Sequence, residues 1–134
     1  MIIIHHSLTK DSGTVSWQAI RKYHKSLGWN DIGYHFGCEL VHGRYEILAG
    51  RPLGKKGAHC KGHNDSIGFC VVGNFDNHWV PKNQFDLSAR YVAGLCDSID
   101  EIHAHNEFSQ KTCPGKMFDM HEFRALTLHY MVTK

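Results

Sequence analysis

The strongest constraint on the fold is a short apolar run at the start of the chain, "MIIIHHS", in which three isoleucines precede two histidines. A run that is apolar at every position suits a buried central strand. The β-branched isoleucines favour a strand over a helix. A second run of this kind, "SIGFCVVGNF" at residues 66–75, predicts another buried strand.

Helical periodicity appears in three further segments. Residues 14–29, "TVSWQAIRKYHKSLGW", predict a helix with Ser16 as its N-cap and Gly28 at its end. Apolar positions at helical spacing predict a second helix over residues 83–102 and a third over residues 117–132. Strands interleaved with helices are typical of an α/β domain.

The remaining segments connect these elements. Residues 34–50 alternate in polarity and carry His42-Gly43 between two extended runs, which predicts a β-hairpin. Residues 50–65 are glycine-rich and polar, and we expect them to form a loop. We expect residues 1–134 to form one domain, because this length buries a sizeable core.

Composition excludes several classes of protein. The net charge of +2 comes from scattered lysines and arginines, so no basic stripe indicates a nucleic-acid partner. No apolar run approaches the roughly 20 residues of a membrane span, and no signal peptide precedes "HHS". Five cysteines without paired spacing are expected as free thiols or metal ligands, in a chain made in the cytoplasm. The oligomeric state is unknown, with a monomer as the default.

The stretch "HAHNEFSQKTCPG" at residues 103–115 contains candidate metal ligands. Zinc accepts imidazole nitrogen and thiolate sulfur, and a catalytic zinc keeps three protein ligands and one open position. His105 and Cys113 lie on an expected loop, and the strand end at His5-His6 is the best source of a third ligand. Only one of those two histidines should face the site, because successive strand residues alternate. Spacing alone leaves a metal site and a histidine-rich turn equally open.

Four segments occur in order: "IIIHHSLTK", "VSWQAIRKYHKSLGWNDIGYHF", "GAHCKGHNDSIGFCVVGNF" and "AHNEFSQKTCPG". Together they resemble the type 2 N-acetylmuramoyl-L-alanine amidases, a family that includes phage amidase lysozymes and peptidoglycan recognition proteins. The likeness covers about residues 2–130. It implies an α/β fold with a mixed central β-sheet flanked by about three helices, and a zinc cleft on one face.

The resemblance also implies roles for individual residues. His5, His105 and Cys113 match the zinc ligands of the family, which implies one Zn²⁺ per chain. Tyr34 of "DIGYHF" matches the catalytic tyrosine, and Lys111 of "KTCPG" matches the catalytic lysine of the phage enzymes. Preorganised donors of this kind stabilise the oxyanion that forms during amide hydrolysis.

Several other residues lie near these motifs. His59 and Asn64 of "GAHCKGHN" resemble positions that line the substrate cleft, and His63 is an equally placed imidazole. We expect His35 to be structural, because it should point away from its neighbour in a regular strand. Glu107 is close in sequence to His105, but no spacing argument gives it a part in proton transfer.

The sequence departs from one branch of the family. Amidases that recycle muropeptides carry a glutamate where this chain has Cys70, and an aspartate ligand where it has Cys113. The chain therefore resembles the branch of phage lysozymes and recognition proteins. A glutamate general base at residue 70 is excluded.

The resemblance implies hydrolysis of the bond between the lactyl group of N-acetylmuramic acid and L-alanine in peptidoglycan. We expect a phage or prophage endolysin that accumulates in the cytoplasm and reaches the cell wall after the membrane is breached. The main alternative is a module that recognises peptidoglycan or muropeptides without cutting them. The complete ligand set and Lys111 favour the enzyme. A structural zinc site is less consistent, since it uses four ligands.

Overall fold

The computed structural model describes residues 1–9, 11 and 16–133 of the chain. The elements, in chain order, are β1 (Ile2–His6), α1 (Trp17–Ser26), β2 (Phe36–Val41), β3 (Arg44–Ala49), β4 (Ile67–Val71), α2 (Lys82–Ala93), the 3-10 turn η1 (Ile99–Glu101), β5 (Ile102–Ala104), the 3-10 turn η2 (His105–Glu107) and α3 (Met120–Val132). No helix among these residues is long and apolar enough to cross a membrane.

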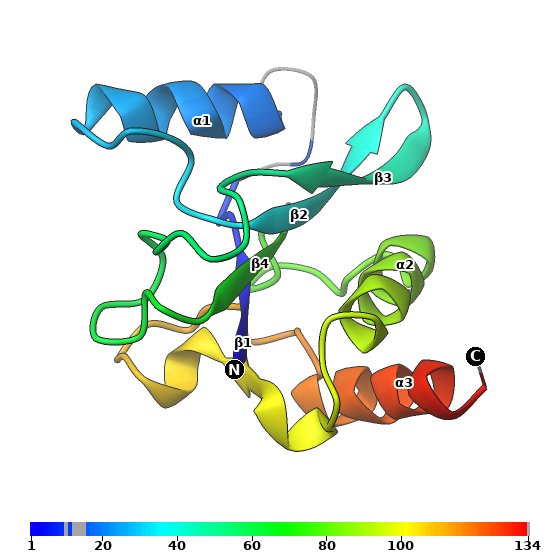
Figure 1. Cartoon of the computed structure of the whole chain (residues 1–134). Helices are drawn as coiled ribbons and strands as arrows, with labels where there is room; N and C mark the ends of the chain where they lie inside the picture. Colours follow the sequence, from blue (N-terminus) through cyan, green and yellow to red (C-terminus); the bar gives the residue numbers. More distant parts are fainter. Residues whose placement is uncertain (10, 12–15, 134) are drawn as a thin grey trace.

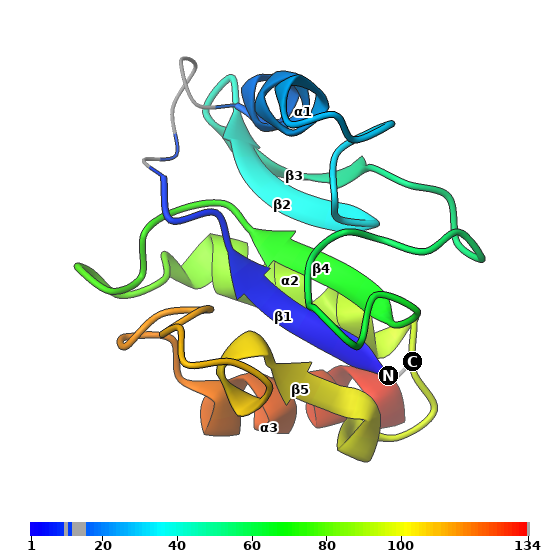
Figure 2. The same ribbon diagram turned by 90° about the vertical axis from the view of Figure 1, so that its left-hand side faces the viewer.

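The five strands form one mixed sheet in the order β3-β2-β4-β1-β5. Strand β1 is parallel to β4 and β5, β2 is parallel to β4, and only the β2-β3 pair is antiparallel. Helices α2 and α3 lie together on one side of the sheet, and α1 lies apart from them beside β2 and β3 (Figures 1 and 2). This arrangement confirms the expected mixed sheet with three flanking helices.

The alternation of side chains along β1 separates two cores. Every residue of β1 is buried. Ile2 and Ile4 pack in a large core that includes Val92 of α2 and Phe123 of α3. A smaller core joins Trp17 and Ile20 of α1 to Cys70 and Val72 on the other side of the sheet. His5 pairs in register with Cys70, so the strand delivers this histidine toward the smaller core.

The hairpin and the first helix form as predicted. His42 and Gly43 have φ angles of 50° and 81°, as a two-residue turn with left-handed backbone requires. Ser16 accepts a hydrogen bond from the backbone N–H of Ala19, and the backbone of Gly28 is left-handed just after the helix. Residues 14 and 15 of the predicted helix lie outside the described residues.

The prediction of one helix over residues 83–102 is wrong beyond Ala93. Helix α2 ends there, and Gly94 follows as its C-cap. Ser98 then caps the 3-10 turn η1. Residues 102–104 form β5 because they pair with β1, and this long-range pairing overrides the helical spacing of the apolar residues.

Two smaller corrections concern the end of the chain. The expected irregular loop over residues 103–115 begins with the end of β5 and the turn η2. The last helix starts at Met120 rather than residue 117, because the Asp119 side chain accepts a hydrogen bond from the N–H of Glu122 and caps it there. No disulfide joins the five cysteines, all of which lie in the described part of the chain.

Candidate metal centre and active site

The candidate metal centre begins where two parallel neighbours, β1 and β5, end. Ile4 and Ala104 are register partners, so the residues that follow them, His5 and His105, come side by side. Their ring centroids are 4.5 Å apart. Functional groups commonly gather at the carboxyl ends of parallel strands, since these ends share one edge of the sheet.

Cys113 reaches the two histidines from the loop between η2 and α3. Its Sγ atom is 3.6 Å from Nδ1 of His5, and the backbone N–H of His6 donates to it over 3.3 Å. The backbone N–H of Asn106 also donates to the carbonyl of Cys113 over 2.8 Å, which closes the loop. One ligand atom from each of His5, His105 and Cys113 lies within 4.8 Å of the others. The three side chains could therefore hold a metal ion.

The protonation chemistry of the cluster fits a metal. Burial lowers the pKa of His5 well below its usual value, and burial likewise lowers the pKa of His105. Both rings are therefore neutral, which is the form that binds metals. Burial raises the pKa of Cys113 to about 12, so its thiol would release a proton on metal binding. Nδ1 of His105 is buried without a hydrogen-bond partner among the described residues, and a metal bond would satisfy the His105 ring.

His6 points to the opposite face of the sheet, as the alternation predicts. Its Nδ1 accepts a hydrogen bond from the backbone N–H of Phe75 over 3.1 Å. The centroids of the His6 and Phe75 rings are 6.1 Å apart. The His6 side chain thus packs on the side of the sheet that holds the large core, while its backbone N–H contacts Cys113.

Asp76 clamps the loop that carries Cys113. Its carboxylate accepts hydrogen bonds from Oγ1 of Thr112 over 2.8 Å and from the backbone N–H of Lys116 over 2.9 Å. These bonds lower the pKa of Asp76. A Cβ atom at Gly115 would meet the Phe75 backbone at 2.6 Å, so the loop can approach this closely only with glycine there. No local pattern in the sequence indicates this role of Asp76.

Tyr34 lies beside the candidate metal centre. Its ring centroid is 5.2 Å from that of His5. Burial raises the pKa of Tyr34 well above its ordinary value, and the neighbouring thiols of Cys70 and Cys113 add to this rise. The phenol therefore keeps its proton at neutral pH and can serve as a hydrogen-bond donor.

Lys111 is exposed and lies on the rim of the same site. It lines the cavity that contains all three candidate ligands. Burial is the main cause of the lowered pKa of His105, and the positive charge of Lys111 lowers this pKa further. The structure thus brings Tyr34 and Lys111, which are far apart in the sequence, to the cavity of the candidate metal centre.

A cavity of about 720 Å³ opens over the cluster. One wall comes from α1 and the residues after it, including Tyr23, His24, Leu27 and Trp29. Tyr23 and Leu27 are 61% and 50% exposed, so both are accessible from the cavity. The volume falls in the range of small-molecule sites, so the cavity could accept a ligand that reaches the cluster.

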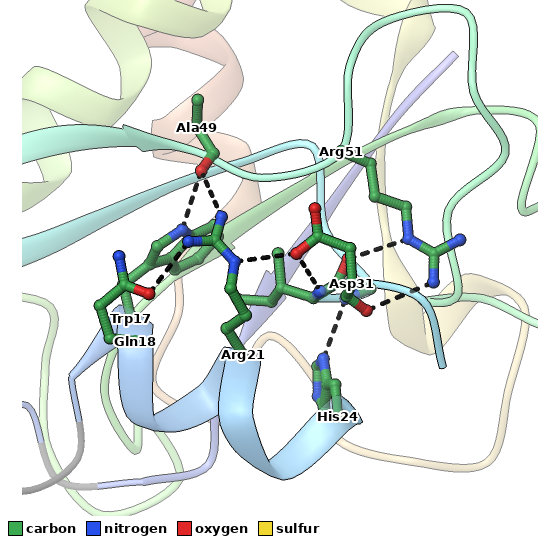
Figure 3. A network of polar contacts seen from close by, with 9 residues as sticks. Trp17, Gln18, Arg21, His24, Asp31, Ala49 and Arg51 are labelled. Atoms are coloured by element: carbon green, nitrogen blue, oxygen red, sulfur yellow. Dashed lines mark hydrogen bonds and ion pairs between the residues drawn. The ribbon is translucent and has the colours of Figure 1, made fainter. Parts of the chain in front are cut away.

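A polar network fixes this wall (Figure 3). Nε of Arg21 in α1 donates to the carboxylate of Asp31 over 2.8 Å, and Nη2 of Arg21 donates to the carbonyl of Ala49 over 3.1 Å. The indole of Trp17 donates to the same carbonyl over 3.0 Å. Nδ1 of His24 accepts a hydrogen bond from the backbone N–H of Gly33. Figure 3 shows the His24 ring pointing from α1 toward the segment that contains Asp31. The network holds α1 against the residues that precede Tyr34.

The two predicted substrate-binding residues lie in different places. His59 lines the cavity, but its ring nitrogens contact His5 and the carbonyl of Ser66. Burial lowers the pKa of His59 to about 4. Oδ1 of Asn64 accepts hydrogen bonds from the backbone N–H groups of His59 and Cys60, and Asn64 lines a separate hollow. Substrate contact by either residue remains a prediction.

Two other histidines considered from the sequence, His35 and His63, are held by contacts within the fold. Nδ1 of His35 accepts a hydrogen bond from Gly68 and Nε2 donates to the carbonyl of Lys55, as expected for a structural histidine. The ring of His63 stacks on Phe108, with centroids 4.1 Å apart.

Glu107 ties the end of β5 to α3. Its carboxylate accepts hydrogen bonds from the backbone N–H of Ala104 over 2.6 Å and from the Arg124 side chain over 3.1 Å. It also contacts Nδ1 of His103 over 2.9 Å. These partners give Glu107 a structural role.

Several known proteins are similar to this chain in sequence and fold. The endolysin of Escherichia phage T7 is 36% identical over 127 residues, a match that covers 89% of this chain and 81% of the endolysin. The solved N-acetylmuramoyl-L-alanine amidase LysC from Clostridium intestinale URNW is 31% identical with a TM-score of 0.78, over 93% of this chain and 82% of that one.

A Drosophila PGRP-LB mutant in complex with tracheal cytotoxin is 28% identical with a TM-score of 0.71, over 87% of this chain and 75% of that one. A family model described as N-acetylmuramoyl-L-alanine amidase matches residues 1–116. This match spans most of the chain and includes all seven site residues predicted from the sequence, from His5 to Cys113. The chain belongs to the N-acetylmuramoyl-L-alanine amidase family.

Proposed function

We propose that this protein is a zinc-dependent N-acetylmuramoyl-L-alanine amidase. It hydrolyses the amide bond between the lactyl group of N-acetylmuramic acid and the first L-alanine of the peptide stem. The observation that carries the proposal is the convergence of His5, His105 and Cys113 within 4.8 Å at a cavity of about 720 Å³. Membership of the amidase family supports it.

The donor set favours zinc. Two imidazoles and one thiolate suit this ion, and three protein ligands leave one position open. When bound, zinc supplies a Lewis acid and a water nucleophile at neutral pH. We propose one Zn²⁺ per chain, held by His5, His105 and Cys113.

Two further side chains would stabilise the developing negative charge. The protonated phenol of Tyr34 is a hydrogen-bond donor next to the His5 ring. The ammonium group of Lys111 brings positive charge to the cavity. Donors that are already in place strengthen their interaction as the oxyanion forms, and each is typically worth about 10²- to 10³-fold in rate. We therefore propose Tyr34 and Lys111 as catalytic residues.

The substrate is proposed to be peptidoglycan or a muropeptide. The cavity joins apolar and aromatic side chains of the α1 wall to the polar cluster, as a glycopeptide ligand requires. The complex of the related PGRP-LB with tracheal cytotoxin is consistent with such a ligand. Similarity to phage endolysins supports action on the bacterial cell wall by residues 1–134 as a single amidase domain.

The test is hydrolysis of purified peptidoglycan by the full chain, before chelation, after chelation and after restoration of zinc. New amino groups of L-alanine are scored against new reducing sugar ends. The proposal predicts zinc-dependent release of amino groups without reducing ends. His105→Ala should abolish release, while the control His121→Ala, on the exposed surface of α3, should retain it. Muropeptide binding without release would instead support the non-catalytic recognition module.

A further inference from the structure

A chain of hydrogen bonds runs behind the candidate metal ligand His5. Nε2 of His5 lies 2.9 Å from Nδ1 of His59. On the far side of the His59 ring, Nε2 lies 3.0 Å from the backbone carbonyl of Ser66. These two hydrogen bonds therefore link His5, a candidate ligand on β1, to the loop that precedes β4.

The chemistry of these atoms fixes where the protons lie. A carbonyl oxygen only accepts, so Nε2 of His59 must carry a proton. In the neutral ring, Nδ1 of His59 is then an acceptor, and Nε2 of His5 must donate to it. His5 is thereby left with an unprotonated Nδ1, the atom that lies 3.6 Å from Sγ of Cys113.

We propose that His59 is a positioning residue that sets the tautomer and ring orientation of His5 for metal binding through Nδ1. This inference rests on the proposed zinc-dependent function. Outer hydrogen-bond partners of metal-binding histidines commonly have this effect, and their loss costs about 10- to 100-fold in metal affinity or activity. His59 then acts through His5 and needs no contact with the substrate.

The surroundings of His59 hold its ring in place. A Cβ atom at Gly57 would meet Cδ2 of His59 at 2.5 Å, and one at Gly68 would meet Cδ2 and Cγ at 2.7 Å. The two glycines therefore allow backbone to pack closely on this ring. The rings of His5 and His59 meet edge to face, with an interplanar angle of 89° and centroids 4.9 Å apart.

Asn64 extends the support to the backbone. Its Oδ1 accepts hydrogen bonds of 2.8 Å from the N–H groups of both His59 and Cys60. The loop thus fixes His59 at its backbone through Asn64 and at its ring through Ser66. His59 and Asn64 of the "GAHCKGHN" stretch thus both help to hold the candidate ligand His5 in place.

The neutral His59 ring, as the acceptor behind His5, affects the net charge of the candidate metal site. A carboxylate behind His5 would add a negative charge to the site, whereas the imidazole of His59 adds none. Cys113 then supplies the one anionic group of the proposed ligand set. A dication held this way keeps a net positive charge, which strengthens its action as a Lewis acid.

Two variants of similar size test the inference. In His59→Asn, the side-chain oxygen can take the place of Nδ1 and still accept from His5. In His59→Gln, the amide lies nearer the place of Nε2, so the acceptor toward His5 is lost. The zinc dissociation constant of each full-length variant is measured by competition with a chelating indicator. His63→Gln is the control from the same loop, outside the cavity lining.

We expect His59→Gln to bind zinc about 10- to 100-fold more weakly than wild type, and His59→Asn to lie within a few-fold. In the zinc-loaded wild type, ¹⁵N chemical shifts should show His5 protonated at Nε2. Equal zinc affinity of the two His59 variants and wild type, or a proton on Nδ1 of His5, would overturn the inference. Peptidoglycan hydrolysis by wild type is scored separately, so failure of the proposed activity would be distinguished from failure of this role.

Discussion

Ile4 of β1 and Ala104 of β5 are register partners, and this pairing sets the rings of the following residues, His5 and His105, 4.5 Å apart. The parallel direction of the strands is essential, because it brings both carboxyl ends to the same edge of the sheet. The candidate metal centre is thus a direct product of the sheet register, completed by Cys113 from a loop held by Asp76.

Lys111→Met should lower kcat for peptidoglycan by about 10²- to 10³-fold, because it removes positive charge from the site of the developing oxyanion. Zinc affinity should not fall, since Lys111 is not a ligand. The matched control is Lys116→Met, an exposed lysine of the same loop outside the cavity lining. Steady-state kinetics on both variants makes the comparison. Equal loss in the two variants would count against a catalytic role.

Tyr34→Phe should also lower kcat by about 10²- to 10³-fold, because only the hydroxyl donor is lost. The ring remains to pack beside His5, so the zinc dissociation constant should stay within a few-fold of wild type. Kinetics and zinc titration on the same preparation separate these effects. If zinc binding fell together with kcat, Tyr34 would be supporting the ligands rather than the reaction.

Asp76→Ala should loosen the loop that presents Cys113. Loss of the bonds to Thr112 and Lys116 should lower the free energy of unfolding by roughly 1–2 kcal/mol and weaken zinc binding. Chemical denaturation and zinc titration measure the two effects. Asp65→Ala, at an exposed loop position, is the control. Unchanged zinc affinity in Asp76→Ala would show that the clamp does not position Cys113.

Asp31 should make stability depend on pH. Although burial opposes its ionisation, hydrogen bonds from the backbone of Ile32 and from Arg21 lower the pKa of Asp31. A lowered folded-state pKa stabilises the fold at pH values above the ordinary aspartate pKa of about 4, and this contribution is lost as the pH falls through the lowered pKa. Asp31→Asn should therefore cost up to about 1 kcal/mol at pH 7 and progressively less below about pH 4.

Denaturation of wild type and Asp31→Asn across this pH range checks the prediction, with Asp65→Asn as the control. A difference in unfolding free energy that stays constant down to pH 2 would contradict it.

Much of the fold follows from local patterns in the sequence. The continuous apolar run of residues 2–4 predicts a buried strand, and Ser16 and Gly28 mark the ends of α1 correctly. The three-residue strand β5 could not be predicted this way, because Ile102 has a spacing that also fits a helix. Only its pairing with β1, a contact between distant parts of the chain, selects the strand.

The candidate site likewise combines residues that could be predicted from the sequence with contacts that could not. The likeness of ordered motifs identified His5, His105 and Cys113, which the structure brings together. The supporting contacts were not predictable, because they join residues far apart in sequence. His5 and His59 are 54 positions apart, and Asp76 is 36 positions from Thr112. Local sequence patterns cannot predict contacts between residues this far apart.

X-ray absorption at the zinc edge of the zinc-loaded protein tests whether His5, His105 and Cys113 bind the metal. We expect one zinc per chain with one sulfur ligand at about 2.3 Å, two imidazole nitrogens at about 2.0–2.1 Å and one further light-atom ligand at the open position. Cys113→Ser should remove the sulfur contribution. A site without sulfur, or one closed by four protein ligands, would contradict the assignment of His5, His105 and Cys113 as an open catalytic zinc centre.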